Sequence, residues 1–155
     1  MYQVQFIWVG KTQEVYLRTG IDNYLSKIKH YVSVECLEIK PANYSQGNQA
    51  LWRKKETQTI LKKIVPSESI IVLDEQGDQK SSLQLAQKLE QLKETEYKQV
   101  NFVIGGAFGL DLPLFKRASF LSLSSMTYTH QMVRLLLLEQ VYRAFTIINK
   151  ESYHH

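Results

Sequence analysis

The sequence has little cysteine, proline or glycine, and each shortage excludes a class of protein. Only Cys36 is a cysteine among 155 residues, which excludes an intrachain disulfide framework and predicts a reducing, cytoplasmic location. Three prolines and seven glycines are too few for a collagen-like or low-complexity chain, and 11% aromatic residues argue against intrinsic disorder. Cys36 lies in a strand-like segment, so we expect it in the core. The histidines lack zinc-ligand spacing, so we expect no metal.

Long hydrophobic runs are also missing. The longest runs have four apolar residues, as in Phe6–Val9 and Leu135–Leu138. A bilayer needs about 20 such residues, so we expect no membrane partner. No basic stretch precedes an apolar one near the first residues, so we expect no signal peptide. With 44% apolar residues the chain can bury one core, and we expect residues 1–155 to form a single domain.

The charge balance is mildly basic. The chain has 19 lysines and arginines against 15 acidic residues, a formal net charge of +4. This charge permits a nucleic-acid partner without requiring one. The excess gathers in one segment, where Glu56 alone opposes Arg53, Lys54, Lys55, Lys62 and Lys63. Two interpretations stay open for this segment: a solvated helix face, or a surface that meets RNA.

Strand-like and helix-like segments alternate along the chain. Apolar or alternating patterns predict strands at 3–10, 32–39, 69–74, 99–105 and 120–124. Helical spacing predicts helices at 15–31, 49–65, 81–93 and 129–150, with a short helix at 113–118. Strands 69–74 and 99–105 have no polar face. This alternation is typical of an α/β protein with a mainly parallel sheet and helices on both faces.

Three loops that follow predicted strands carry the residue types of a binding site. They are Leu73–Gly77, the glycine-rich turn Gly105–Gly109, and Leu123–His130. The G-G-x-x-G spacing of the turn matches neither a dinucleotide fingerprint nor a phosphate loop, and a simple tight turn is its other interpretation. Ligands of parallel sheets bind beyond the carboxyl ends of the strands. We therefore expect one pocket with apolar walls and backbone polar groups, suited to a ligand that carries adenine.

The last predicted helix is more apolar than its place in a small domain requires. Its apolar residues cover more than one face, so we expect a partner subunit to bury the excess. Two polar pairs lie on this helix, His130 with Arg134 and Glu139 with Arg143, each four residues apart. Two interpretations stay open for each pair. Its side chains form a solvated ridge, or the helix lies at the margin of an interface and the arginines contact phosphates.

Several motifs together resemble one family. They are Leu73-Asp74-Glu75-x-Gly77, Gly105-Gly106-x-x-Gly109-Leu110, the segment from Leu121 to Arg134, Glu139-Gln140-x-Tyr142-Arg143-Ala144 and the terminal Tyr153-His154. This set resembles the RlmH family, bacterial SPOUT-class methyltransferases that methylate N3 of a pseudouridine in large-subunit (23S) ribosomal RNA. The resemblance runs over essentially the whole chain. Two positions depart from it: Ala107 stands where the family has Pro or Ser, and His155 where it has Lys or Arg.

The resemblance implies a fold, a cofactor and partners. The C-terminal segment would thread a trefoil knot, and two chains would form a homodimer through the C-terminal helix. The substrate would be 23S ribosomal RNA in the assembled ribosome. S-adenosylmethionine would bind in the knot, against Leu73, Gly105, Gly106, Leu123, Ser124, Ser125, Met126, Thr127 and Tyr128.

The chemistry of this expected reaction suggests roles at the acceptor. His130, or His154 from the tail, would take or relay the imide proton that leaves the pseudouridine. Arg134 and Arg143 would hold phosphate or a developing oxyanion, and Tyr153 and His154 would contact RNA. Two alternatives stay open: a SPOUT-class tRNA methyltransferase, and a ribosome-binding module without catalysis.

Overall fold

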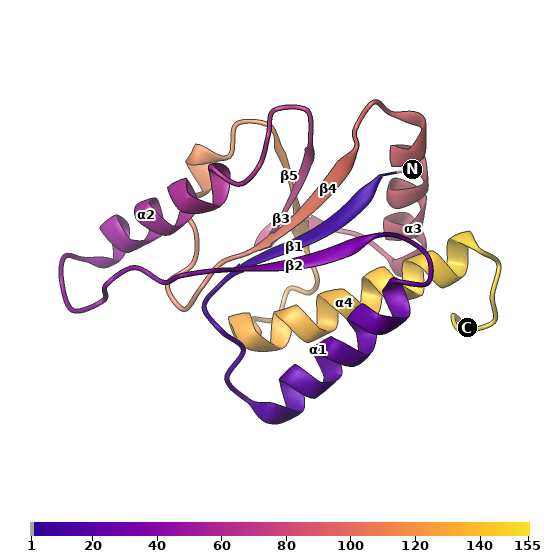
Figure 1. The fold of residues 1–155 in the computed structure, drawn as a ribbon, viewed down its shortest axis with the longest axis horizontal. Coiled ribbons are helices and arrows are strands. Elements are labelled where there is room, and N and C mark those ends of the chain that lie inside the picture. The colour runs from indigo at the N-terminus through magenta and orange to yellow at the C-terminus, as the bar shows by residue number, and fades with distance from the viewer. Residues whose placement is uncertain (1) are drawn as a thin grey trace.

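The computed structural model describes residues 2–155, and its centre is one five-stranded sheet. The strand order is β2-β1-β4-β3-β5, and every pair of neighbouring strands is parallel (Figure 1). The α/β fold with a parallel sheet, predicted from the sequence, is therefore confirmed. The strands are β1 Gln3–Val9, β2 Val34–Ile39, β3 Ser69–Gln79, β4 Gln99–Ile104 and β5 Ala118–Ser122.

Helices cover both faces of the sheet, but unequally. Helices α1, α3 and α4 lie on one face, and α2 lies on the other (Figure 1). Side chains alternate along a strand, so Phe6 of β1 enters the larger core beneath α4 while Ile7 enters the smaller core beneath α2. The helices are α1 Val15–Ile28, α2 Gln49–Leu61, α3 Ser82–Gln91 and α4 His130–Ile148.

Side-chain caps fix where three helices begin. Asn48 accepts a hydrogen bond from the backbone N–H of Leu51 at the start of α2, and Ser81 forms a capping box with Gln84 at the start of α3. At α4, Thr129 accepts from the N–H of Met132 at 3.2 Å. This last cap makes His130 the first residue of α4, directly after a loop that we expect to bind a ligand.

The strand β3 is irregular at the carboxyl edge of the sheet. Leu73 and Asp78 both pair with Leu121, so residues 74–77 leave the ladder as a bulge, and β3 runs to Gln79 instead of ending at residue 74. Bulges re-aim side chains. Here the bulge turns Asp74 and Glu75 toward the cavity described below.

Some local predictions were wrong. The short helix expected at 113–118 is only a 3-10 turn at Leu112–Leu114, and β5 starts at Ala118 rather than 120. Residues from 118 onward pair with β3 instead, because ladder hydrogen bonds and burial outweigh a weak helical preference. Cys36 is exposed rather than in the core, since it lies on β2, an edge strand with a neighbour on one side only.

None of the helices formed by residues 2–155 combines the length and the apolar character that crossing a bilayer requires.

Candidate active site

A cavity of about 640 Å³ opens at the carboxyl ends of β3, β4 and β5. Its volume is that of a small-molecule site. The three loops that we expected to form one pocket all line it. Of the residues predicted to bind the cofactor, all but Ser125 line it: Leu73, Gly105, Gly106, Leu123, Ser124, Met126, Thr127 and Tyr128.

The glycine-rich turn after β4 forms one wall of this cavity. Gly109 has φ +80°, a left-handed conformation that L side chains rarely adopt, and its N–H donates to the carbonyl of Gly106 at 3.1 Å. At Gly105, a Cβ atom would lie 2.9 Å from Cγ of Leu110 and 3.0 Å from the carbonyl carbon of Gly109. The turn therefore closes so tightly that only glycine fits at Gly105, and no side chain at that position separates the backbone from the cavity.

The loop between β5 and α4 forms the opposite wall. Ser122 donates to the carbonyl of Ser124 at 2.9 Å, and the hydroxyl of Ser124 accepts from the N–H of Met126 at 3.0 Å. The hydroxyl of Thr127 donates to the carboxylate of Glu75 at 2.5 Å, which joins this loop to the bulge of β3. Met126 is 72% exposed. An apolar side chain held open to solvent beside a cavity offers a surface for an apolar ring of a ligand.

Helix α2 supports the glycine-rich turn, a contact that sequence reasoning missed. Phe108, at the tip of the turn, packs against Tyr44 and Trp52, with ring centroids 4.8 and 4.9 Å away. Arg53 lines the cavity beside Gly109. No short motif marks these contacts, because they join segments about 60 residues apart through packing alone.

Two buried polar side chains of α2 complete that support. Thr57 accepts from the backbone N–H of Asp111 at 2.9 Å, just after the turn. Glu56 is 2% exposed and accepts from the N–H of Ala42 at 2.9 Å and from the hydroxyl of Tyr44. Its other oxygen has no hydrogen-bond partner and lies 3.5 Å from the position of a Cβ on Gly106. The carboxylate thus sits directly behind the glycine pair.

His130 lines the cavity at the first turn of α4. Burial lowers the pKa of this imidazole from its ordinary value of 6.5, and the charge of Arg134 lowers it further. The side chain is therefore neutral near pH 7, with a ring nitrogen able to accept a proton. The structure places this candidate base at the cavity, as its sequence position suggested.

Arg134 does not face the cavity, and its burial contradicts the roles expected for it toward phosphate or an oxyanion. Its side chain has no exposed surface. Its terminal nitrogens donate to the carbonyls of Val9 and Gly10 and to the hydroxyl of Thr12, and the guanidinium lies 5.0 Å from the ring centroid of Trp8. Burial lowers its pKa to about 10, which leaves it cationic near neutral pH. Arg134 therefore ties α4 to the end of β1.

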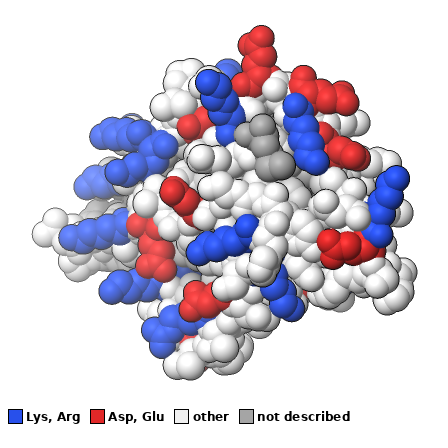
Figure 2. All heavy atoms as spheres, turned by 45° about the vertical axis from the view of Figure 1, so that its right-hand side comes forward, with Lys and Arg blue, Asp and Glu red and all other residues white. Residues whose placement is uncertain are grey.

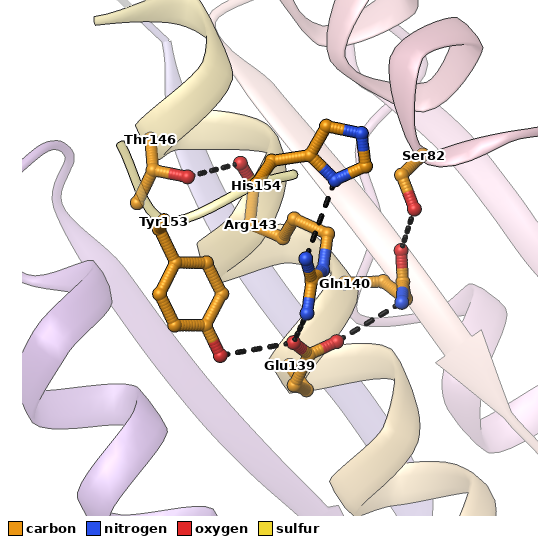
Figure 3. A network of polar contacts seen from close by, with 7 residues as sticks. All are labelled: Ser82, Glu139, Gln140, Arg143, Thr146, Tyr153 and His154. Carbon is orange, nitrogen blue, oxygen red and sulfur yellow. Dashed lines mark hydrogen bonds and ion pairs between the residues drawn. The ribbon is translucent and has the colours of Figure 1, made fainter. Parts of the chain in front are cut away.

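A second polar cluster lies at the other end of α4 (Figure 3). Glu139 accepts from Arg143 at 2.5 Å and from the hydroxyl of Tyr153 at 3.0 Å. The guanidinium of Arg143 lies 4.7 Å from the ring centroid of Tyr153, and its NH1 nitrogen lies 3.3 Å from Nδ1 of His154. Because guanidinium only donates, Nδ1 of His154 is the acceptor in this contact. The hydrogen bond that Arg143 donates to Glu139 raises the pKa of the guanidinium, which stays charged.

His130 at the cavity and the polar cluster around Arg143 are far apart in one chain. His130 and Arg143 are thirteen residues apart on one helix, about 20 Å along its axis at 1.5 Å per residue. The residues predicted for proton transfer and RNA contact thus fall into two groups. His130 belongs to the cavity, and Arg143, Tyr153 and His154 form a separate cluster, the tail cluster. A single protomer does not bring them to one acceptor atom.

Within residues 2–155, no three or more His, Cys, Asp or Glu side chains gather in a metal-binding arrangement.

Comparison with known proteins gives the class and then the family. A family model described as "Predicted SPOUT methyltransferase" matches residues 2–154, so the class is that of the SPOUT methyltransferases. Three relatives named ribosomal RNA large subunit methyltransferase H are 43, 43 and 41% identical over 154, 155 and 157 residues; they come from Geotalea daltonii, Geobacter sulfurreducens and Acetivibrio thermocellus. Each match covers at least 98% of this chain and 99% of the relative. The chain belongs to this RlmH family and is a methyltransferase.

A solved structure adds support for the fold alone. A probable methylase family protein from Haemophilus influenzae Rd KW20 superposes with a TM-score of 0.54 over 99% of this chain and 71% of that chain. Its sequence is 11% identical, so the likeness concerns the fold and carries no argument about the site.

Proposed function

We propose that this protein transfers the methyl group of S-adenosylmethionine to N3 of a pseudouridine in large-subunit (23S) ribosomal RNA. It acts on the assembled ribosome in the cytoplasm. Its chain forms a single domain whose C-terminal segment threads a trefoil knot. The single observation that carries the proposal is the cavity of about 640 Å³, lined by the loops that resemble the cofactor loops of the family. The names of the relatives support a large-subunit ribosomal RNA as the acceptor.

The cavity fits the proposed cofactor in size and chemistry. Gly105 and Gly106 let a ligand approach the backbone, where N–H and C=O groups can pair with an adenine edge. Leu73, Met126 and Val133 supply apolar contacts, while Asp74 and Glu75 complement a positively charged sulfonium. When bound, the cofactor supplies an electrophilic methyl group for an in-line displacement. The residues of the cavity orient it and keep water away.

His130 accepts the proton that leaves N3 of the acceptor. It lies on the cavity wall, and its lowered pKa keeps the imidazole neutral and able to take a proton near pH 7. Its position at the first turn of α4 also holds it close to the loop of Thr127 and Tyr128, which line the same cavity. Removing the N3 proton makes the acceptor nitrogen a better nucleophile.

The tail cluster acts across a homodimer. Helix α4 keeps Leu135, Leu136, Tyr142 and Ile148 only partly buried, which supports a partner seated against this helix. In a two-fold dimer with antiparallel α4 helices, the carboxyl end of one helix lies near the amino end of the other. The tail cluster of one chain, Arg143, Tyr153 and His154, would then contact RNA at the partner's cavity. The distance of about 20 Å between His130 and Arg143 within one chain would therefore not keep them from acting on the same RNA.

The test is methyl transfer from labelled S-adenosylmethionine to four acceptors: assembled ribosomes, separated large subunits, naked ribosomal RNA and tRNA. Label in ribosomes and not in tRNA, mapped to N3 of a pseudouridine, is the expected result. Label in tRNA alone would replace the acceptor with a tRNA. Absence of both methyl transfer and cofactor binding would favour a ribosome-binding module without catalysis.

A further inference from the structure

We propose that a basic surface on α2 docks the phosphate backbone of ribosomal RNA beside the cofactor cavity. The α2 surface consists of Lys54, Lys55, Lys62 and Lys63. This inference rests on the proposed function, because it names where the RNA substrate is held. It also chooses between the two interpretations that the sequence left open for this segment.

Helix α2 presents these lysines on the side away from the protein. Glu56, Thr57 and Ile60 are buried against the sheet, whereas the four lysines are exposed. Lys54 and Lys62 are eight residues apart, as are Lys55 and Lys63, so the cations form two rows of about 12 Å along the helix and the turn that ends it. Such rows present several cations to one strand of phosphates.

The charge of the α2 surface has no internal compensation. Across residues 2–155 the one ion pair within 4.0 Å is Arg143 with Glu139. Glu56, the sole acid between residues 49 and 65, is buried and already hydrogen-bonded to Ala42 and Tyr44. Figure 2 shows lysine and arginine side chains projecting at the left-hand edge, the side on which α2 lies in Figure 1. Cations that form no ion pair attract a polyanion.

The location of the α2 surface suits the proposed acceptor. Arg53, next to Lys54, lines the cofactor cavity, so the cations continue from the cavity rim onto the helix. Helix α2 lies on the opposite face of the sheet from α4, and a dimer formed through α4 leaves it accessible (Figure 1). The positions between the lysines, Gln58 and Thr59, are polar, which favours phosphate contacts over insertion into a lipid surface.

The experiment compares the full-length wild type with two quadruple variants. The test variant carries Lys54→Gln, Lys55→Gln, Lys62→Gln and Lys63→Gln. The matched control carries Lys29→Gln, Lys80→Gln, Lys93→Gln and Lys98→Gln, four exposed lysines outside the α2 surface. Both lose the same charge, and Gln has nearly the helix propensity of Lys. Each is assayed for methyl transfer to ribosomes, for cofactor affinity, and for ribosome binding at several salt concentrations.

The test variant should bind ribosomes with a salt slope smaller by about 3, since each lost phosphate contact removes about 0.7 to 0.9. Its KM for ribosomes should rise at least about tenfold, with kcat and cofactor affinity unchanged and the control variant like the wild type. An equal change in both variants, or none in either, would overturn the inference. So would a loss of binding to anionic phosphatidylglycerol vesicles while ribosome binding stays intact. If the wild type itself methylates no ribosome, the proposed function fails instead.

Discussion

The guanidinium of Arg134 donates to the carbonyl oxygen of Val9 at 2.6 Å, which joins the second turn of α4 to the carboxyl end of β1. The same side chain also donates to Gly10 and Thr12 at 3.0 Å each, and it lies over the ring of Trp8. One buried cation thus serves three acceptors from a single short segment. Because α4 begins at the cavity with His130, this attachment sets where the candidate base lies.

Arg134→Lys should destabilise the protein by about 3 kcal/mol. A lysine ammonium is too compact to serve all three acceptors, and each buried acceptor left unpaired costs about 1 to 3 kcal/mol. Urea denaturation measures the change. Arg143→Lys is the matched control, since its partly exposed ion pair contributes at most about 1 kcal/mol. Equal losses for the two variants would contradict the structural role of Arg134.

Thr127→Val should weaken cofactor binding about fivefold. The variant keeps the shape of the side chain but loses the hydrogen bond to Glu75, worth about 1 kcal/mol, which holds the last loop against the bulge of β3. Isothermal titration with S-adenosylmethionine measures the affinity. Thr19→Val, at an exposed position of α1, should leave it unchanged. Wild-type affinity in Thr127→Val would show that this hydrogen bond does not shape the cavity.

Trp52→Ala should weaken cofactor binding although Trp52 does not line the cavity. Its ring packs on Phe108 at a centroid distance of 4.9 Å and on Tyr44 at 5.0 Å, and such aromatic pairs are each worth about 1 kcal/mol. Without this support the glycine-rich turn moves more freely, and we expect about a tenfold loss of affinity. The control is Tyr97→Ala, an exposed aromatic residue beyond the cavity lining. Unchanged affinity in Trp52→Ala would show that the packing of α2 on the glycine-rich turn does not affect cofactor binding.

The pH dependence of kcat should report the neutral form of His130. Its pKa lies below 6.5 because of burial and Arg134, so kcat should fall only as the pH drops below that range and stay level above pH 7. His130→Gln should reduce kcat and remove this acid limb. A retained limb in the variant would assign the proton transfer to another group.

The same shift in pKa affects stability with a definite sign. The folded protein binds the His130 proton less readily than the unfolded chain does, so the free energy of unfolding falls as the pH drops from about 6.5 toward the lowered pKa. Above about 6.5 the imidazole is neutral in both states and adds no pH dependence. Denaturation of His130→Gln between pH 5 and 7 should therefore show a flatter profile than the wild type.

The sheet and the three loops were predictable because they depend on local patterns. Apolar segments such as Ile70–Leu73 and Phe102–Ile104 can only be buried strands when helices alternate with them. Parallel strands then place their following loops at one edge, which is where Leu73, Gly105 and Thr127 meet. The chemistry of the cofactor came from the family resemblance, not from these patterns.

Other features depend on contacts that no local pattern records. Helical spacing pairs His130 with Arg134, but their environments depend on how α4 is oriented on the sheet. This orientation buries the arginine against the ring of Trp8 and leaves the histidine at the cavity. Similarly, the packing of Trp52 on Phe108 joins two segments far apart in sequence. The exposure of Cys36 follows from strand order, which places β2 at the edge.

In the proposed dimer, the cavity of one chain works with the tail cluster of its partner. A mixed dimer tests it, with one chain carrying Gly105→Val and the other Arg143→Ala. The valine collides with Leu110 and the backbone of Gly109, so that chain loses cofactor binding but keeps its tail. The other chain keeps its cavity but loses the contacts of Arg143 with Glu139 and His154.

The measurement is methyl transfer to ribosomes by mixed dimers purified through two different affinity tags. Each homodimeric variant should be nearly inactive. If the site is shared between chains, the mixed dimer contains one intact cavity facing one intact tail, and it should show about half the wild-type rate, since one of two sites works. If each chain uses its own tail, the mixed dimer contains no intact site, and a rate as low as that of the homodimeric variants would contradict a site shared between chains.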